Sequence, residues 1–129
     1  ASNENIIYEN NKPIEIAFRI DHNGNSIPVE LSGVLGKQHI YPILSAFAVG
    51  ISQGLNTVNI KQALVNHEPA QGRMRLIEGI NGSIIIDDSY NASPTAVNEA
   101  LNTLKQINTT GKKITVLGDM MELGNYSYD

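Results

Sequence analysis

The chain has 129 residues, of which 41% are hydrophobic and 17% are charged, so it is long enough for one compact domain or parts of two. The formal net charge of −4 and the scattered basic residues argue against a disordered charged tail and against bulk binding of nucleic acid. The sequence has no cysteine, no apolar run near the roughly 20 residues of a membrane helix and no secretory signal, so we expect a cytoplasmic protein without thiolate chemistry.

The first third of the chain predicts an antiparallel β-hairpin. Apolar and other residues alternate over residues 14–20 and again over 27–31, with Asn23-Gly24 between the two runs. An Asn-Gly pair between two alternating runs is the strongest short-range signal for a hairpin. One face of this hairpin is apolar, so we expect it to pack on another element.

Two helices are predicted next. An apolar stripe at helical spacing covers residues 40–51, where Pro42 suits the first turn and Gly54 ends the helix. Thr57 is the expected cap of a second, shorter helix. The turn-rich stretch 66–72 then provides the candidate domain boundary.

The second half predicts another hairpin and a βαβ unit. Residues 74–78 and 83–87 form the hairpin, and the unbroken apolar run before Asp87 indicates a strand buried on both faces. Ser93 and the following proline predict a helix start, and Gly111 closes that helix. Residues 113–118 are a further apolar run, so strand, helix and strand predict a parallel, right-handed crossover. The predicted fold class is mixed α/β.

Acidic residues begin the loops after both strands of this predicted unit. They are Asp87 and Asp88 in the first loop and Asp119 in the second. In open α/β sheets ligands bind outside the carboxyl ends of the strands, and carboxylates there suit ribose hydroxyls, metal-bound phosphate or an ammonium group. The alternative is that Asp88 and Ser93 merely cap the following helix, although one cap needs only one acceptor.

Few basic residues are candidates for a site. Arg73 suits a bidentate phosphate contact, with a solvated surface arginine as the alternative. His39 begins a helix and could direct a ring nitrogen at a ligand, whereas His22 and His67 are expected to be solvated. The sequence contains no phosphate loop of the G-x-x-x-x-G-K-[ST] type and no cluster of metal ligands.

Four segments together resemble the Mur ligases. They are LGKQHIYPILSAFAVGISQG at 35–54, GRM at 72–74, IIIDDSYNASP at 84–94 and KITVLGDMMELG at 113–124. The resemblance runs from about Gly33 to Gly124 and covers most of the chain.

The resemblance implies a piece of a three-domain amide ligase of peptidoglycan synthesis. Residues 1–68 would come from the end of the central ATPase domain, and residues 69–129 would begin a Rossmann-like C-terminal domain. ATP, with Mg²⁺, would activate a carboxylate of UDP-N-acetylmuramoyl-tripeptide as an acyl phosphate, which D-alanyl-D-alanine then attacks. Since the family's phosphate loop and magnesium ligands have no match here, we expect this chain alone to be inactive and to hold no cofactor.

The resemblance also assigns roles to single residues. Arg73 matches the arginine that reaches ATP phosphate, and Asp88 matches the aspartate that binds ribose hydroxyls. Asn91 lies in the same loop, near the nucleotide. Tyr90 and Asp119 fall on the side of the other substrates.

The helix motif departs from the family pattern. Gln38, His39 and Pro42 stand where the family has His, Asn and Asn. The second Asn commonly contacts adenine, and proline has no side-chain donor or acceptor. His39 is therefore the candidate replacement, by stacking or by one hydrogen bond.

Other interpretations stay open at this point. One is another amide ligase of the superfamily, such as a folylpolyglutamate or cyanophycin synthetase, although the loops at 87–91 and 118–124 speak against it. Another is a non-catalytic binding module. As a piece of a larger enzyme, the chain should expose apolar surface and self-associate, because its first hairpin, first helix and βαβ unit would normally pack on the rest of that enzyme.

Overall fold

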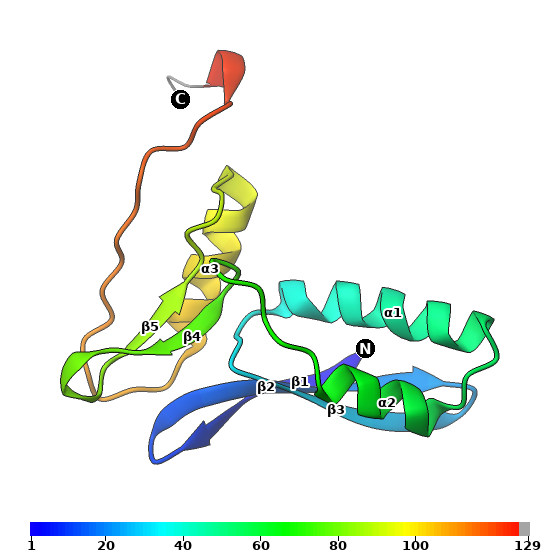
Figure 1. The fold of residues 1–129 in the computed structure, drawn as a ribbon. Coiled ribbons are helices and arrows are strands. Elements are labelled where there is room, and N and C mark those ends of the chain that lie inside the picture. Colours follow the sequence, from blue (N-terminus) through cyan, green and yellow to red (C-terminus); the bar gives the residue numbers. More distant parts are fainter. Residues whose placement is uncertain (127–129) are drawn as a thin grey trace.

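The computed structural model describes residues 1–126, in which three helices longer than one turn accompany two antiparallel sheets. The larger sheet has the order β1–β2–β3, with β1 at Ser2–Glu9, β2 at Lys12–His22 and β3 at Asn25–Ser32. The smaller sheet lies beside one end of the larger one (Figure 1).

The predicted first hairpin is confirmed. Strands β2 and β3 pair in an unbroken antiparallel register from Glu15↔Ser32 to His22↔Asn25. Asn23 and Gly24 both have positive φ, 48° and 78°, as a two-residue turn of type I′ requires. Strand β1 was not predicted from the sequence, because most of its side chains are polar and exposed and it pairs only at the edge.

Helices cover one face of the larger sheet (Figure 1). The short 3-10 turn η1 (Lys37–His39) leads into α1 (Ile40–Ser52), and α2 (Thr57–Val65) follows. Both helices were predicted, but the cap of α2 is Asn56 rather than Thr57, since Asn56 Oδ1 accepts the N–H of Asn59 at 2.8 Å. The apolar face of the sheet and the helices share one core, made of Ile16, Phe18, Ile20, Val29, Leu31, Ile40, Ile43, Phe47, Ile60 and Leu64.

The predicted second hairpin is also confirmed. Strands β4 (Arg75–Glu78) and β5 (Ile84–Asp87) pair antiparallel, and the short turn η2 (Ile80–Gly82) joins them. The expectation that this strand is buried on both faces is wrong, because the side chain of Ile85 is 51% exposed. Within the described residues β5 has β4 as its only strand neighbour.

Helix α3 (Pro94–Gln106) begins as predicted and ends early. The Oγ of Ser93 accepts the N–H of Ala96 at 3.2 Å, so Ser93 is the N-cap, with proline at the first position. The helix does not reach Gly111, because Ile107 turns to an extended conformation and buries its side chain in the core, 8% exposed.

The strand predicted at residues 113–118 is not formed. These residues have no regular structure, and Ile114, Val116 and Leu117 are 74%, 91% and 61% exposed. Figure 1 shows this segment in orange, running apart from β5 and back toward the start of α3. An apolar run becomes a parallel strand only where a neighbouring strand takes up its hydrogen bonds. The predicted βαβ unit is therefore absent from the described residues, whereas the mixed α/β class is confirmed.

The two sheets are joined by backbone pairing. The N–H of Leu35 donates to the carbonyl of Met74 at 3.1 Å, and the N–H of Leu76 donates to the carbonyl of Gly33 at 2.8 Å. The side chains of Val34, Leu35 and Met74 are at most 1% exposed. This junction sets the position of residues 72–74, where the candidate site lies.

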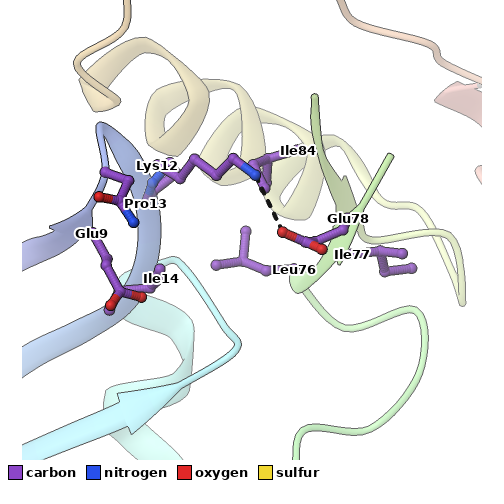
Figure 2. A pocket seen from close by; sticks show the side chains of 9 residues that line it. Glu9, Lys12, Pro13, Ile14, Leu76, Ile77, Glu78 and Ile84 are labelled. Carbon is purple, nitrogen blue, oxygen red and sulfur yellow. Dashed lines mark hydrogen bonds and ion pairs between the residues drawn. The ribbon is translucent and has the colours of Figure 1, made fainter. Parts of the chain in front are cut away.

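A cavity of about 250 Å³ opens where the β1–β2 turn faces the β4–β5 hairpin (Figure 2). Its lining is mostly apolar, and the ion pair between Lys12 and Glu78 crosses it at 3.2 Å. It lies at the turn end of the hairpin, opposite to the end formed by Arg75 and Asp87. No helix among residues 1–126 is both long and apolar enough to span a bilayer.

Candidate functional site

The candidate site forms where residues 72–74 meet the loop after β5. The N–H of Gly72 donates to Asp87 Oδ2 at 3.1 Å, and the N–H of Met74 donates to Asp88 Oδ1 at 3.1 Å. In return, the N–H of Tyr90 donates to the carbonyl of Gly72 at 3.2 Å. The two segments that the sequence singled out are thus bound to each other by two carboxylate side chains and one backbone hydrogen bond.

Arg73 lies between these anchors and points outward. Its Cζ is 4.2 Å from the centroid of the Tyr90 ring, within the range of a cation–π contact. Both side chains are exposed, and Arg73 forms no ion pair with any carboxylate in the described part of the chain. The guanidinium is therefore oriented by the ring while its donors stay open to an anionic ligand.

The backbone of this segment is constrained. Gly72 has φ +69°, and a Cβ at this position would lie 2.8 Å from the amide nitrogen of Tyr90. Met74 has φ 51° although it carries a side chain, and that side chain is only 1% exposed. The buried methionine holds a conformation that such residues seldom adopt, as occurs at functional sites.

Asp87 has hydrogen-bond partners on both carboxylate oxygens. Besides Gly72, it binds the N–H and the hydroxyl of Ser89, at 3.2 Å and 2.6 Å from Oδ1. The Ser89 hydroxyl is the main cause that holds the pKa of Asp87 below its ordinary value, and the amides of Ser89 and Gly72 act in the same direction. The carboxylate is therefore kept charged at neutral pH.

Only one carboxylate oxygen of Asp88 accepts a hydrogen bond from the described residues. Its Oδ1 accepts from Met74, while Oδ2 forms no hydrogen bond with another described residue. The alternative that Asp88 caps the following helix is wrong, because Ser93 alone supplies that cap. One carboxylate oxygen thus remains for a ligand.

His39 comes close to the same residues from the start of α1. Its ring is partly buried, and Nε2 has no hydrogen-bond partner within residues 1–126. Burial is the main cause that lowers its pKa, aided by His67 and opposed by the carbonyl of Arg73 and the charge of Asp88. The carbonyl of Arg73 and the charge of Asp88 thus both act on this ring.

Asn91 and Asp119 are the remaining residues that the sequence predicted for the site. Asn91 lies in the same loop and is exposed, with its Oδ1 bound to the N–H of Ala92 at 2.9 Å. Asp119 is exposed in the loop that follows the segment predicted to be a strand, and no hydrogen bond or ion pair joins it to the other site residues within residues 1–126. His67 is exposed as expected, whereas His22 is only partly exposed and its ring contacts Phe47 edge-on, with 5.7 Å between the ring centroids.

Sequence reasoning missed the backbone role of Asp87 and the contribution of Ser89. The available signal was the pair of adjacent aspartates, since one helix cap would need only one acceptor. No group of three or more His, Cys, Asp or Glu side chains in the described residues could hold a metal ion.

The fold and the site define a class of protein. Residues 72–128 match the sequence family described as Mur ligase, glutamate ligase domain. This range begins at the glycine that precedes Arg73 and includes the loop of Asp87 and Asp88. The chain belongs to the Mur ligase family, as its sequence motifs indicated.

The relatives of this chain include ligases of one particular kind within this family. The UDP-N-acetylmuramoyl-tripeptide–D-alanyl-D-alanine ligase of Bacillus subtilis is 36% identical over 92 residues, which are 71% of this chain and 20% of that protein. The Escherichia coli ligase of the same name is 34% identical over 89 residues, covering 69% and 19%.

The fold is similar to that of a solved Mur ligase structure. MurF from Acinetobacter baumannii superposes with a TM-score of 0.79 at 29% identity, covering 96% of this chain and 25% of that one. The chain therefore spans about a fifth of the length of the curated relatives it matches.

Proposed function

We propose that this chain is part of an ATP-dependent amide ligase of peptidoglycan synthesis that joins D-alanyl-D-alanine to UDP-N-acetylmuramoyl-tripeptide. The names of the related ligases support the choice of substrates. The observation that carries the proposal is the outward-facing Arg73, held on Tyr90 beside a carboxylate with one unbound oxygen. A cytoplasmic location goes with this activity.

We assign the nucleotide side of the reaction to four residues. Arg73 would bind a phosphate of ATP, because a guanidinium offers paired donors to a phosphate. Asp88 Oδ2 would accept from the ribose hydroxyls, since Oδ1 is already bound to Met74. His39 would contact adenine, and Asn91 would face the nucleotide from the same loop.

The reaction requires groups that the described residues of this chain do not supply. In it, a carboxylate of the tripeptide takes the terminal phosphoryl group of ATP, and the amine of D-alanyl-D-alanine then displaces phosphate from the acyl phosphate to form the amide. Charge on the transferring group is offset by positive groups such as Arg73. No group of three or more His, Asp or Glu side chains among the described residues could hold Mg²⁺.

The substrate side is assigned to Tyr90 and Asp119. Tyr90 exposes 70% of its side chain next to Arg73, which supports this role. The role of Asp119 rests on the family resemblance alone. We also propose the division into residues 1–68 and 69–129, supported by the start of the family match at residue 72 and by the irregular stretch between α2 and β4.

A chimera tests the function. The matching segment of the Bacillus subtilis ligase is replaced by the corresponding residues of this chain, and phosphate release and product mass are measured with ATP, UDP-N-acetylmuramoyl-tripeptide and D-alanyl-D-alanine. We expect amide formation that depends on D-alanyl-D-alanine and is not supported by glutamate or aspartate. A folded chimera that releases no phosphate would refute the proposal, and one that prefers glutamate or aspartate would favour another ligase of the superfamily.

A further inference from the structure

We propose that Asp87 is a positioning residue, whose carboxylate fixes the backbone of Gly72 against the loop and thereby orients the guanidinium of Arg73 on the ring of Tyr90. The contacts rest on geometry alone, whereas the consequence for catalysis rests on the proposed function. Asp87 has no role in the assignments above, which use the second aspartate of the pair.

The carboxylate of Asp87 closes a ring of hydrogen bonds. Oδ2 accepts from the N–H of Gly72 at 3.1 Å, and Oδ1 accepts from the N–H and the hydroxyl of Ser89 at 3.2 and 2.6 Å. The carbonyl of Gly72 then accepts from the N–H of Tyr90 at 3.2 Å. Gly72 and Ser89 are therefore held on opposite oxygens of one side chain.

Arg73 and Tyr90 each follow directly after a residue of this ring. Their side chains start from backbone that the ring has fixed, which leaves the stacking distance of 4.2 Å little freedom to change. The ring also excludes a side chain at position 72, where a Cβ would lie 2.8 Å from the amide nitrogen of Tyr90. Glycine at position 72 and aspartate at position 87 thus act together.

A carboxylate is the group that this ring needs. Three donors converge on its two oxygens, from Gly72 on one side and from Ser89 on the other. An asparagine would offer one acceptor oxygen and would turn an NH₂ group toward the remaining donors. Arg75, the cross-strand partner of Asp87, favours the charged form from β4.

The test on the chain itself uses the ring current of Tyr90. The side-chain protons of Arg73 should be shifted upfield in the 129-residue protein, and Tyr90→Leu defines their position without the ring. We expect Asp87→Asn to move them to that position. Asp21→Asn is the matched control, because Asp21 also binds two serine hydroxyls but lies in the other sheet. A folded Asp87→Asn variant that keeps the upfield shift would overturn the proposal.

A titration of the wild-type chain decides the question even if that variant fails to fold. The amide protons of Gly72 and Ser89 should both follow the protonation of Asp87, since both donate to its carboxylate. The charged group that acts on this carboxyl is Arg75 on β4, and Asp88 is the next residue in the chain, so variants of both are titrated as controls. A chemical shift of the Gly72 amide proton that does not change as Asp87 is protonated would contradict the proposed ring.

The chimera gives the catalytic readout. Asp87→Asn should lower kcat/KM for ATP by about 10-fold or more, as expected for loss of charged hydrogen bonds, and should cause no further loss in an Arg73→Ala background. Additive losses would show that Asp87 does not act through Arg73. An inactive parent chimera would count against the proposed function, while the two NMR measurements would still decide the role of Asp87.

Discussion

Two residues just before β4 adopt left-handed backbone angles, and the hydrogen bonds of the candidate site attach to both of them. Gly72 has φ +69° and binds Asp87, while Met74 has φ 51° and binds Asp88. For Gly72 the conformation is easy, but a methionine adopts it only under constraint. The buried side chain of Met74 and the carboxylate of Asp88 supply that constraint from opposite sides.

Gly72→Ala should destabilise the chain more than Gly82→Ala. The two glycines have nearly the same φ, +69° and +72°, so the backbone penalty cancels, but only at position 72 would a Cβ meet a neighbour. We expect an excess loss of about 1–3 kcal/mol in the free energy of unfolding, as for overpacking of a filled site. Urea unfolding of both variants measures it, and equal losses would argue against the close approach to Tyr90.

His39 should make the stability depend on pH. Burial holds its pKa below the ordinary 6.5, so the unfolded chain takes up the proton first as the pH falls. Stability should therefore decline as the pH drops below about 6.5, and His39→Gln should remove this decline. Urea midpoints between about pH 7.5 and pH 5 test it. The same decline in His39→Gln would exclude His39 as its source. Asp87 and Asp21, whose pKa values are lowered from 3.8, lose their stabilising effect only at more acidic pH.

The sequence could predict most residues of the site and only part of their arrangement. Arg73, Asp88, Tyr90 and Asn91 belong to two short motifs, and the second hairpin brings those motifs together at one end. The proposed role of Asp87 could not be predicted, because two of its three donors are backbone N–H groups, which leave no pattern in the sequence.

At the scale of elements, turns and caps were more predictable than burial. Asn23-Gly24 and Ser93-Pro94 specify their structures locally, and both were confirmed. Strand β1 escaped prediction because an exposed edge strand needs no apolar alternation. The apolar run at 113–118 was predicted to be a strand and is not one. Its composition fits a buried strand, but no strand of the described residues lies beside it.

The cap of α2 provides a direct test of the structure at this scale. Asn56→Ala should lower the free energy of unfolding by about 1 kcal/mol, because Asn56 Oδ1 satisfies the N–H of Asn59. Thr57→Ala, one residue later, should cost less because Thr57 is not the cap. Thermal or urea unfolding measures the difference. A larger loss for Thr57→Ala would support the cap expected from the sequence.

For the whole molecule, the two sheets share a core but touch through few polar contacts. Lys12 of β2 pairs with Glu78 of β4 at 3.2 Å, Lys37 pairs with Glu99 of α3 at 2.9 Å, and the N–H of Asn108 donates to the hydroxyl of Tyr8 at 2.8 Å. The apolar side chains of Val34 and Met74 are buried between the sheets. Exposed ion pairs stabilise little, so the apolar junction must carry most of the association. The residues of the site lie at this junction.

Self-association of the chain stays a prediction, and exposed apolar side chains support it. Ile114 and Val116 are 74% and 91% exposed, and the outer edge of β5 has no strand partner within residues 1–126. Light scattering should give a mass above the 14.0 kDa of one chain, and Val116→Lys with Ile114→Lys should shift it toward that value. A strictly monomeric mass at high concentration, with no binding of an apolar dye, would contradict this expectation.

The KM for ATP of an Asp88→Asn chimera tests the central claim most directly. Asparagine keeps the oxygen that accepts from Met74 and replaces only the unbound Oδ2, so the fold is preserved while the acceptor for ribose is lost. We predict a rise in this KM of about 10- to 100-fold, the equivalent of about 1.5–3 kcal/mol for a charged hydrogen bond, with the Asp21→Asn chimera unchanged. An Asp88→Asn chimera with the KM and turnover of its parent would contradict the account.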